Sequence, residues 1–136
     1  MALILWSNDY SVGVPRLDAD HIVIASLINH IDDAKQTGAD ESVVAGILRV
    51  LLDFAATHFR REEAMMAKAG YAGLADHVRE HELLAEQLGE LHDAYSTTRD
   101  PEMSREIMEL LNFWLVEHIL TVDMHYRPQL APEVER

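Results

Sequence analysis

The sequence contains no cysteine, which excludes disulfide bonds, zinc–thiolate sites and iron–sulfur clusters. Any metal ion that this chain binds must therefore be held by nitrogen and oxygen ligands. The lack of cysteine also favours a cytoplasmic location over a secreted protein built on disulfides.

Positive charge is scarce, because 11 Lys and Arg residues stand against 24 Asp and Glu residues, for a formal net charge of −13. The basic residues form no cluster larger than the pair Arg60-Arg61. A surface of this charge repels phosphate backbones, so we expect no nucleic-acid partner. The acidic side chains are expected to form a solvated surface.

A long apolar run is also missing from the N-terminus. The apolar residues 1–6 have no basic segment before them and are followed by Ser7, Asn8 and Asp9. They are too few to span a bilayer and lack the basic region of a signal peptide. We therefore expect no membrane insertion.

Glycine and proline are few, at 6 and 4 residues, and they divide the chain into four long segments of helical composition. We predict a single domain, 1–136, with an arm at 1–18, helices at about 19–37, 40–68, 73–95 and 101–124, and a tail at 125–136. Asp18 is the expected N-cap of the first helix, Gly38 its end, and Asp100-Pro101 the start of the fourth. Short loops favour antiparallel neighbours, so the predicted fold is all-α, an up-down-up-down four-helix bundle.

Seven potential metal ligands are spread over these four segments: His21, His58, Glu62, His77, His81, His118 and Asp123. Residues four apart lie one turn apart on nearly the same helix face, so each close pair among them can reach one metal ion. If these groups share one small core, their burial would be costly without a metal to pair them. Imidazole nitrogens with carboxylate oxygens suit iron, although manganese accepts the same ligands.

The same rotation argument separates ligands from neighbouring residues. Glu63 lies about 140° around the helix from His58, so we expect Glu63 to be solvated or paired rather than to bind metal. His30 is expected to face water, and His92 lies about three turns along the helix from His81, too far to share its site.

The second bridging carboxylate requires a choice near the end of the fourth helix. His125 returns to the face of His118 after two turns, whereas Asp123 points about 140° away from His118 in a regular helix. We prefer Asp123, because a dinuclear site needs anionic bridging oxygens and Glu62 alone supplies few. This choice requires the last helical turn to loosen, for instance through a π-type bulge.

Two other classes of metalloprotein lack their signatures in this sequence. Ferritin-like di-iron proteins use Glu-x-x-His on two helices, and no histidine here has a glutamate three residues before it. Zinc proteases of the His-Glu-x-x-His type need a second histidine, which the segment His81 to Ala85 lacks.

The arrangement of these residues resembles the hemerythrins, and more closely the bacterial single-domain hemerythrins. The resemblance covers nearly the whole chain and rests on Trp6, Gly13-Val14, Asp18 to His21, His58-Phe59, Glu62-Glu63, Met66, Tyr71, His77, His81, Trp114-Leu115, His118-Ile119 and Asp123. It implies a four-helix bundle that holds two irons and binds dioxygen reversibly.

The resemblance also implies a role for each ligand. His77, His81 and His118 would ligate one iron, and His21 and His58 would hold the second, which keeps one position open. Glu62 and Asp123 would bridge the two Fe ions, together with an oxo or hydroxo group. Four further residues would line a dry, apolar oxygen pocket at the open position: Ile24, Phe59, Trp114 and Leu115.

Three functions agree with this interpretation. We expect first a monomeric oxygen-binding protein without enzyme activity, which stores, transports or delivers dioxygen in the cytoplasm, for example to an oxygen-consuming enzyme. The alternatives are an oxygen or redox sensor that signals to a partner, and a di-iron peroxidase or oxidase. The last would need a positioned proton donor, and the predicted pocket lining offers none.

Overall fold

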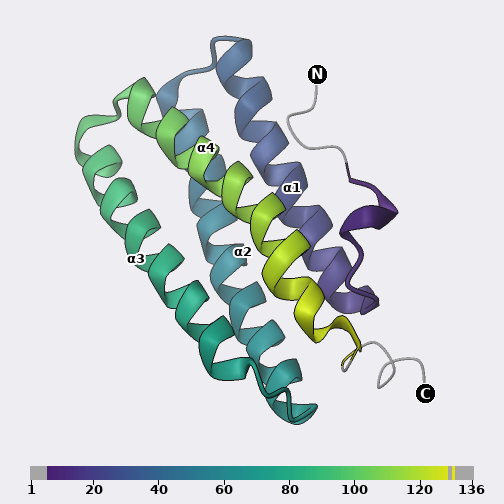
Figure 1. The fold of residues 1–136 in the computed structure, drawn as a ribbon. Helices are drawn as coiled ribbons and strands as arrows, with labels where there is room; N and C mark the ends of the chain where they lie inside the picture. Colours follow the sequence, from purple (N-terminus) through teal and green to yellow (C-terminus); the bar gives the residue numbers. More distant parts are fainter. Residues whose placement is uncertain (1–5, 129, 131–136) are drawn as a thin grey trace.

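The protein is an all-α four-helix bundle, as predicted, and its computed structural model describes residues 6–128 and residue 130. The helices are α1 (Pro15–Gln36), α2 (Glu41–Lys68), α3 (Leu74–Thr98) and α4 (Pro101–Glu117), joined by short loops (Figure 1). A 3-10 turn, η1 (Asn8–Tyr10), precedes α1, and α4 continues into a π-helical segment, η2 (His118–Val122), and a 3-10 turn, η3 (Asp123–Tyr126). Both α1 and α3 pack against α2 and α4.

The starts of α2 and α4 and the end of α1 lie where the sequence predicts them. The Asp40 carboxylate accepts the Ser42 N–H at 2.8 Å at the start of α2, and the Asp100 carboxylate accepts the Glu102 N–H at 3.0 Å at the start of α4. Gly38 follows α1 with a φ of 75°, a left-handed conformation that glycine adopts without steric cost.

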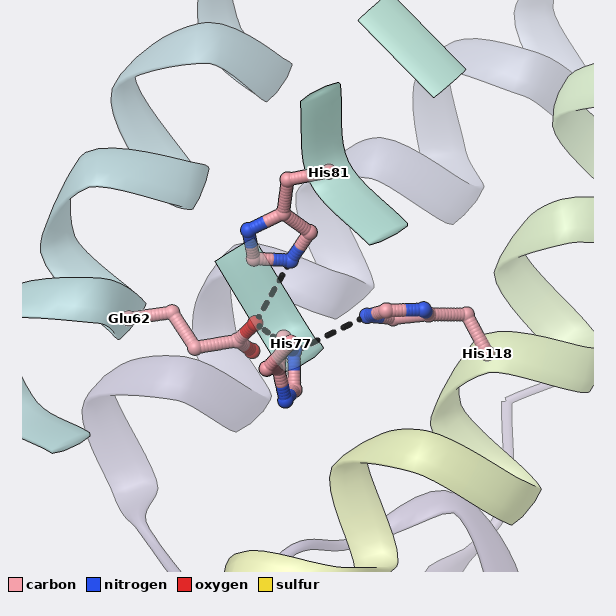
Figure 2. A group of neighbouring side chains, drawn as sticks. All are labelled: Glu62, His77, His81 and His118. Carbon is pink, nitrogen blue, oxygen red and sulfur yellow. Dashed lines mark hydrogen bonds and ion pairs between the residues drawn. The ribbon is translucent and has the colours of Figure 1, made fainter. Parts of the chain in front are cut away.

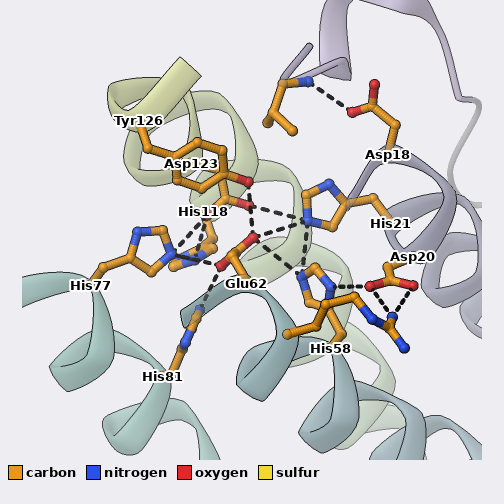
Figure 3. Close-up of polar contacts among 12 residues, drawn as sticks. Asp18, Asp20, His21, His58, Glu62, His77, His81, His118, Asp123 and Tyr126 are labelled. Atoms are coloured by element: carbon orange, nitrogen blue, oxygen red, sulfur yellow. Dashed lines mark hydrogen bonds and ion pairs between the residues drawn. The ribbon is translucent and has the colours of Figure 1, made fainter. Parts of the chain in front are cut away.

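The start of α1 corrects our prediction. The helix begins at Pro15 rather than near residue 19, with Val14 as the N-cap, because proline at the first helical position lacks an N–H that would have no partner there. Asp18 is therefore not the N-cap. Its carboxylate accepts the Val12 N–H at 2.8 Å and the Ser11 hydroxyl at 2.6 Å, which ties the arm to the first turn of α1 (Figure 3).

The ends of α3 and α4 also differ from the prediction. The α3 helix continues from residue 95 to Thr98 and ends at Arg99, whose φ of 53° is left-handed. Regular α-helix in α4 stops at Glu117 instead of reaching residue 124, and helical backbone continues into the predicted tail through residue 128. Parts of the predicted arm and tail fall on residues 1–5, 129 and 131–136, outside the described residues.

The core lies along the bundle axis and receives buried apolar side chains from every helix. The α2 helix is long and apolar enough to cross a membrane by length and composition alone. In the bundle it is a core helix, because its buried residues include the polar His58 and Glu62, which contact residues of other helices. Apart from Ser104 near the start of α4, the buried polar side chains among the described residues lie at one end of the bundle.

Candidate metal centre

The seven predicted ligands meet at one end of the bundle (Figure 3). His21 lies near the start of α1, His58 and Glu62 near the end of α2, and His77 and His81 near the start of α3. Because successive helices are antiparallel, these positions share one end, where η2 and η3 add His118 and Asp123. All seven side chains are buried, with at most 4% of their surface exposed.

The Glu62 carboxylate, which is fully buried, faces histidines on two sides (Figure 3), and Figure 2 shows the side with His77, His81 and His118. Its Oε1 lies 2.8 Å from His77 Nε2 and 3.0 Å from His81 Nε2. Its Oε2 lies 3.3 Å from His58 Nε2 and 3.6 Å from His21 Nε2. Each oxygen therefore belongs to a different half of the cluster, as in a bridging carboxylate.

Asp123 divides its oxygens in the same way. Its Oδ1 lies 3.0 Å from His77 Nε2 and 2.8 Å from His118 Nε2, and its Oδ2 lies 3.2 Å from His21 Nε2. The cluster consequently has a three-histidine half (His77, His81 and His118) and a two-histidine half (His21 and His58), and both carboxylates contribute an oxygen to each half.

Three of the converging ligand atoms have no hydrogen-bond partner, which indicates that a metal fits between them. Both Asp123 oxygens and His81 Nε2 are buried and have no hydrogen-bond partner, although they lie close to other ligand atoms. The Asp123 oxygens and His81 Nε2 lie close to other ligand atoms without being aligned with them as donor and acceptor. A cation bound between these atoms would pair with each of them, whereas a buried polar group without a partner costs about 1–3 kcal/mol. The donor set fits two metal ions.

The π-helical segment η2 explains how Asp123 reaches the centre. The Asp123 N–H bonds to the carbonyl of His118, five residues earlier, so the chain gains an extra residue in this turn. A regular helix would direct Asp123 about 140° away from His118. The loosened turn required by the sequence argument is confirmed, and it brings both side chains into one cluster.

Two carboxylates hold the outer nitrogens of ligand histidines. Asp20 Oδ2 lies 3.0 Å from His58 Nδ1, and Arg61 Nη1 donates to Asp20 Oδ1 at 2.6 Å. Burial raises the pKa of Asp20, but the neighbouring His58 and Arg61 lower this pKa overall, so the carboxylate stays charged. Glu63 Oε2 pairs with His81 Nδ1 at 2.7 Å, so Glu63 is paired as we expected. Such partners fix the orientation of ligand rings and raise their basicity.

Sequence reasoning missed the roles of Asp20, Arg61 and Tyr126. Arg61 follows His58 by three residues, a spacing that places both side chains on one helix face. This spacing was the feature of the sequence from which a role of Arg61 near His58 could have been predicted. Tyr126, placed in the tail by the sequence, is fully buried and donates its hydroxyl to Glu62 Oε2 at 3.0 Å. Burial and the charges of Glu62 and Asp123 raise the pKa of Tyr126 far above its usual range, so the phenol keeps its proton.

The four residues expected to line an oxygen pocket lie in or beside the core. Ile24, Phe59 and Leu115 are buried, and Trp114 is partly buried. Phe59 stacks on His81 with ring centroids 4.1 Å apart, and Trp114 stacks on His118 at 4.5 Å. These contacts are with the three-histidine half, so the lining of an open position at the other half stays a prediction.

The remaining histidines lie away from the cluster. His30 and His125 are exposed, and His92 lies at a separate pocket between α2 and α3. None of them joins the groups of described residues whose ligand atoms converge.

In the metal-free protein, two of the ligand histidines are expected to be protonated near neutral pH. Burial lowers the pKa values of His21 and His77, but the Asp123 and Glu62 carboxylates have the larger effect. They raise both pKa values to about 9, from the ordinary histidine value of 6.5. The folded chain then binds protons that the unfolded chain releases. The contribution of His21 and His77 to the free energy of unfolding is complete below about pH 6.5 and is lost as pH rises through 9.

We therefore expect the melting temperature of the metal-free protein to fall between pH 6.5 and 9, on the order of 5 °C. Thermal denaturation followed by circular dichroism in the presence of a chelator would measure it. The metal-loaded protein is the control, because ligand histidines are neutral and should show a smaller change. A melting temperature of the metal-free protein that rises over this range would contradict the expectation.

An antiparallel four-helix bundle with five buried histidines and two carboxylates converging at one end is the architecture of a metal-binding protein. Residues 12–130 match the hemerythrin HHE cation binding domain. The chain belongs to the hemerythrin family.

Known proteins similar to this chain include bacteriohemerythrins. That of Stenotrophomonas maltophilia (strain R551-3) is 32% identical over 136 residues, which is 100% of this chain and 87% of the relative. That of Methylococcus capsulatus (strain Bath) is also 32% identical, over 96% of this chain and 99% of the relative. A crystal structure of wild-type hemerythrin superimposes with a TM-score of 0.83 at 30% identity, covering 96% of this chain and 99% of that one.

Proposed function

We propose that this protein binds dioxygen reversibly at a non-haem di-iron centre and serves in oxygen storage, transport or delivery. The observation that carries the proposal is the unequal division of the ligands. Glu62 and Asp123 give each half one oxygen apiece, but three histidines face one half and two face the other. The family membership supports the same assignment.

The unequal division provides a place for a small ligand. The three-histidine half supplies five protein ligand atoms and the two-histidine half supplies four. Metal ions held by these residues would have one protein ligand fewer in the two-histidine half, and that half would therefore have room for a small ligand. Two ferrous ions held here would supply the two electrons that a bound dioxygen accepts and returns on release.

The surrounding residues favour reversible binding over catalysis. The cluster is shielded from water, since none of the seven ligands is more than 4% exposed. Tyr126 is the hydroxyl group that contacts the bridging Glu62, and its raised pKa makes it a poor acid. A reductive enzyme needs a group that delivers a proton at working pH. Tyr126 therefore holds its proton rather than donating it.

Anaerobic loading with ferrous iron followed by cycles of oxygenation and deoxygenation tests the proposal. We expect two irons per chain and a visible charge-transfer band that appears with oxygen and disappears when oxygen is removed, through repeated cycles. A permanent ferric spectrum after the first exposure would refute reversible binding. Sustained peroxide reduction with an added reductant, well above that of free iron, would instead make the protein an enzyme.

The proposal includes a monomer in the cytoplasm with dioxygen as its ligand and an oxygen-consuming enzyme as the recipient. Sedimentation of the loaded protein as a single 15.4 kDa species would support the monomer, and a stable dimer would contradict it.

A further inference from the structure

A polar pocket of about 240 Å³ lies between the start of α3 and the η2–η3 segment, directly outside the metal centre. Its lining includes Tyr71, Asp76, His77, Glu80 and His125. His77 is a ligand of the three-histidine half, whereas Asp76, Glu80 and His125 are exposed to solvent. The pocket therefore connects the protein surface to one of the metal ligands.

The outer part of this pocket is suited to attract a cation. Asp76 and Glu80 are four residues apart on α3, so both carboxylates lie on one helix face, and both line the pocket. His125 contributes an imidazole from the opposite wall, on η3. Carboxylate oxygen and imidazole nitrogen are both ligands for divalent transition metals.

The inner wall of the pocket contains an imidazole nitrogen without a partner. His77 is 1% exposed, and its Nε2 faces Glu62 Oε1 at 2.8 Å and Asp123 Oδ1 at 3.0 Å. The Nδ1 on the other side of the ring is buried and has no hydrogen-bond partner. Figure 3 shows this second ring nitrogen directed away from the two carboxylates. His77 thus presents one nitrogen to each side of the wall.

We propose that this pocket is the access site through which a divalent cation, the ferrous ion, reaches the centre. The inference rests on the proposed function, since it assumes that the seven ligands bind iron. Asp76, Glu80 and His125 would hold the hydrated ion at the surface, and His77 Nδ1 would be the first buried ligand. Glu62 and Asp123, which lie beside Nε2 of the same ring, would then take up the ion.

The ligand atoms of Asp76, Glu80 and His125 do not converge tightly, which agrees with transient binding of an ion rather than with its storage. Among the described residues, the groups whose ligand atoms converge tightly contain only residues of the central cluster, not Asp76, Glu80 or His125. An ion in the pocket would therefore keep part of its water and exchange rapidly. Tight binding begins only at the central cluster, where the ligands converge.

A second pocket, of about 230 Å³, also reaches the cluster, next to His118. Its lining includes Phe113, Trp114 and Glu117, and it shares Glu80 with the first pocket. A hydrated cation loses solvation beside the large apolar rings of Phe113 and Trp114, which makes this route the less favourable one. Asp76 and Glu117 each line only one of these two pockets, so they provide the test between the two routes.

The experiment measures the rate at which metal-free protein takes up ferrous iron without oxygen. Samples are quenched at timed intervals with a coloured ferrous chelator, and the iron retained by the protein is counted. The test variant is Asp76→Asn/Glu80→Gln, and the control is Glu86→Gln/Glu90→Gln. The control removes the same charge from exposed residues of the same helix with the same spacing.

We expect Asp76→Asn/Glu80→Gln to load about tenfold more slowly than wild type at low salt, because local charge raises the encounter rate of a counter-ion. The difference should shrink at about 1 M salt, where screening is short-ranged. The control should load within about twofold of wild type, and all three proteins should reach the same final iron content.

Equal loading rates for both double variants would overturn the access site. Because Glu80 lines both pockets, the single variants Asp76→Asn and Glu117→Gln separate the two routes. Slowing by Glu117→Gln without slowing by Asp76→Asn would also overturn the access site and place access beside His118. These results differ from failure of the proposed function, in which the wild-type chain itself takes up no iron.

Discussion

Glu62→Gln is expected to reduce the metal content of the protein from two ions per chain to one at most. Glu62 supplies one anionic oxygen to each half of the centre, and each oxygen faces histidine nitrogens of its own half. Glutamine keeps the shape of the side chain but is neutral and has a single acceptor oxygen. One half therefore loses its carboxylate oxygen, and the remaining oxygen loses its charge.

Metal content after anaerobic loading and desalting, measured by elemental analysis, decides this prediction. Glu63→Gln is the matched control, because Glu63 is the next residue, carries the same charge and contacts only the outer nitrogen of His81 among the ligands. That variant should retain two ions, with weaker binding in the three-histidine half. Circular dichroism should show both variants helical, and two tightly held ions in Glu62→Gln would refute the bridging role.

Asp20→Asn is expected to weaken the two-histidine half selectively. The Asp20 carboxylate holds His58 Nδ1 and is itself held by Arg61. Loss of such an outer partner typically lowers metal affinity about 10–100-fold. Because no described contact joins Asp20 to the three-histidine half, the first equivalent of metal should bind as in wild type and the second more weakly.

A calorimetric titration of metal-free protein with ferrous iron under anaerobic conditions would resolve the two steps. Asp33→Asn is the control, since Asp33 is an exposed residue of the same helix and the substitution changes the charge equally. It should titrate like wild type. Equal weakening of both steps in Asp20→Asn would show that Asp20 acts on the whole bundle rather than on His58.

Features that depend on local chemistry and helix rotation could be predicted from the amino-acid sequence alone. The lack of cysteine limits the ligands to nitrogen and oxygen, and the spacing of four residues places His58 with Glu62 and His77 with His81 on common faces. Capping residues such as Asp40 and Asp100 define helix ends because their hydrogen bonds reach only two residues along the chain. These features need no knowledge of the neighbouring helices.

The division of the ligands between the two halves could not be predicted without the packing of the helices. The oxygens of Glu62 and Asp123 face histidines from three other elements, and the pairing of each oxygen depends on how those elements pack. Tyr126 could not be placed from the sequence, because the π-helical turn before it shifts the phase of every later residue. Helical periodicity predicts the face on which a residue lies, whereas contacts between helices depend on the packing of the whole core.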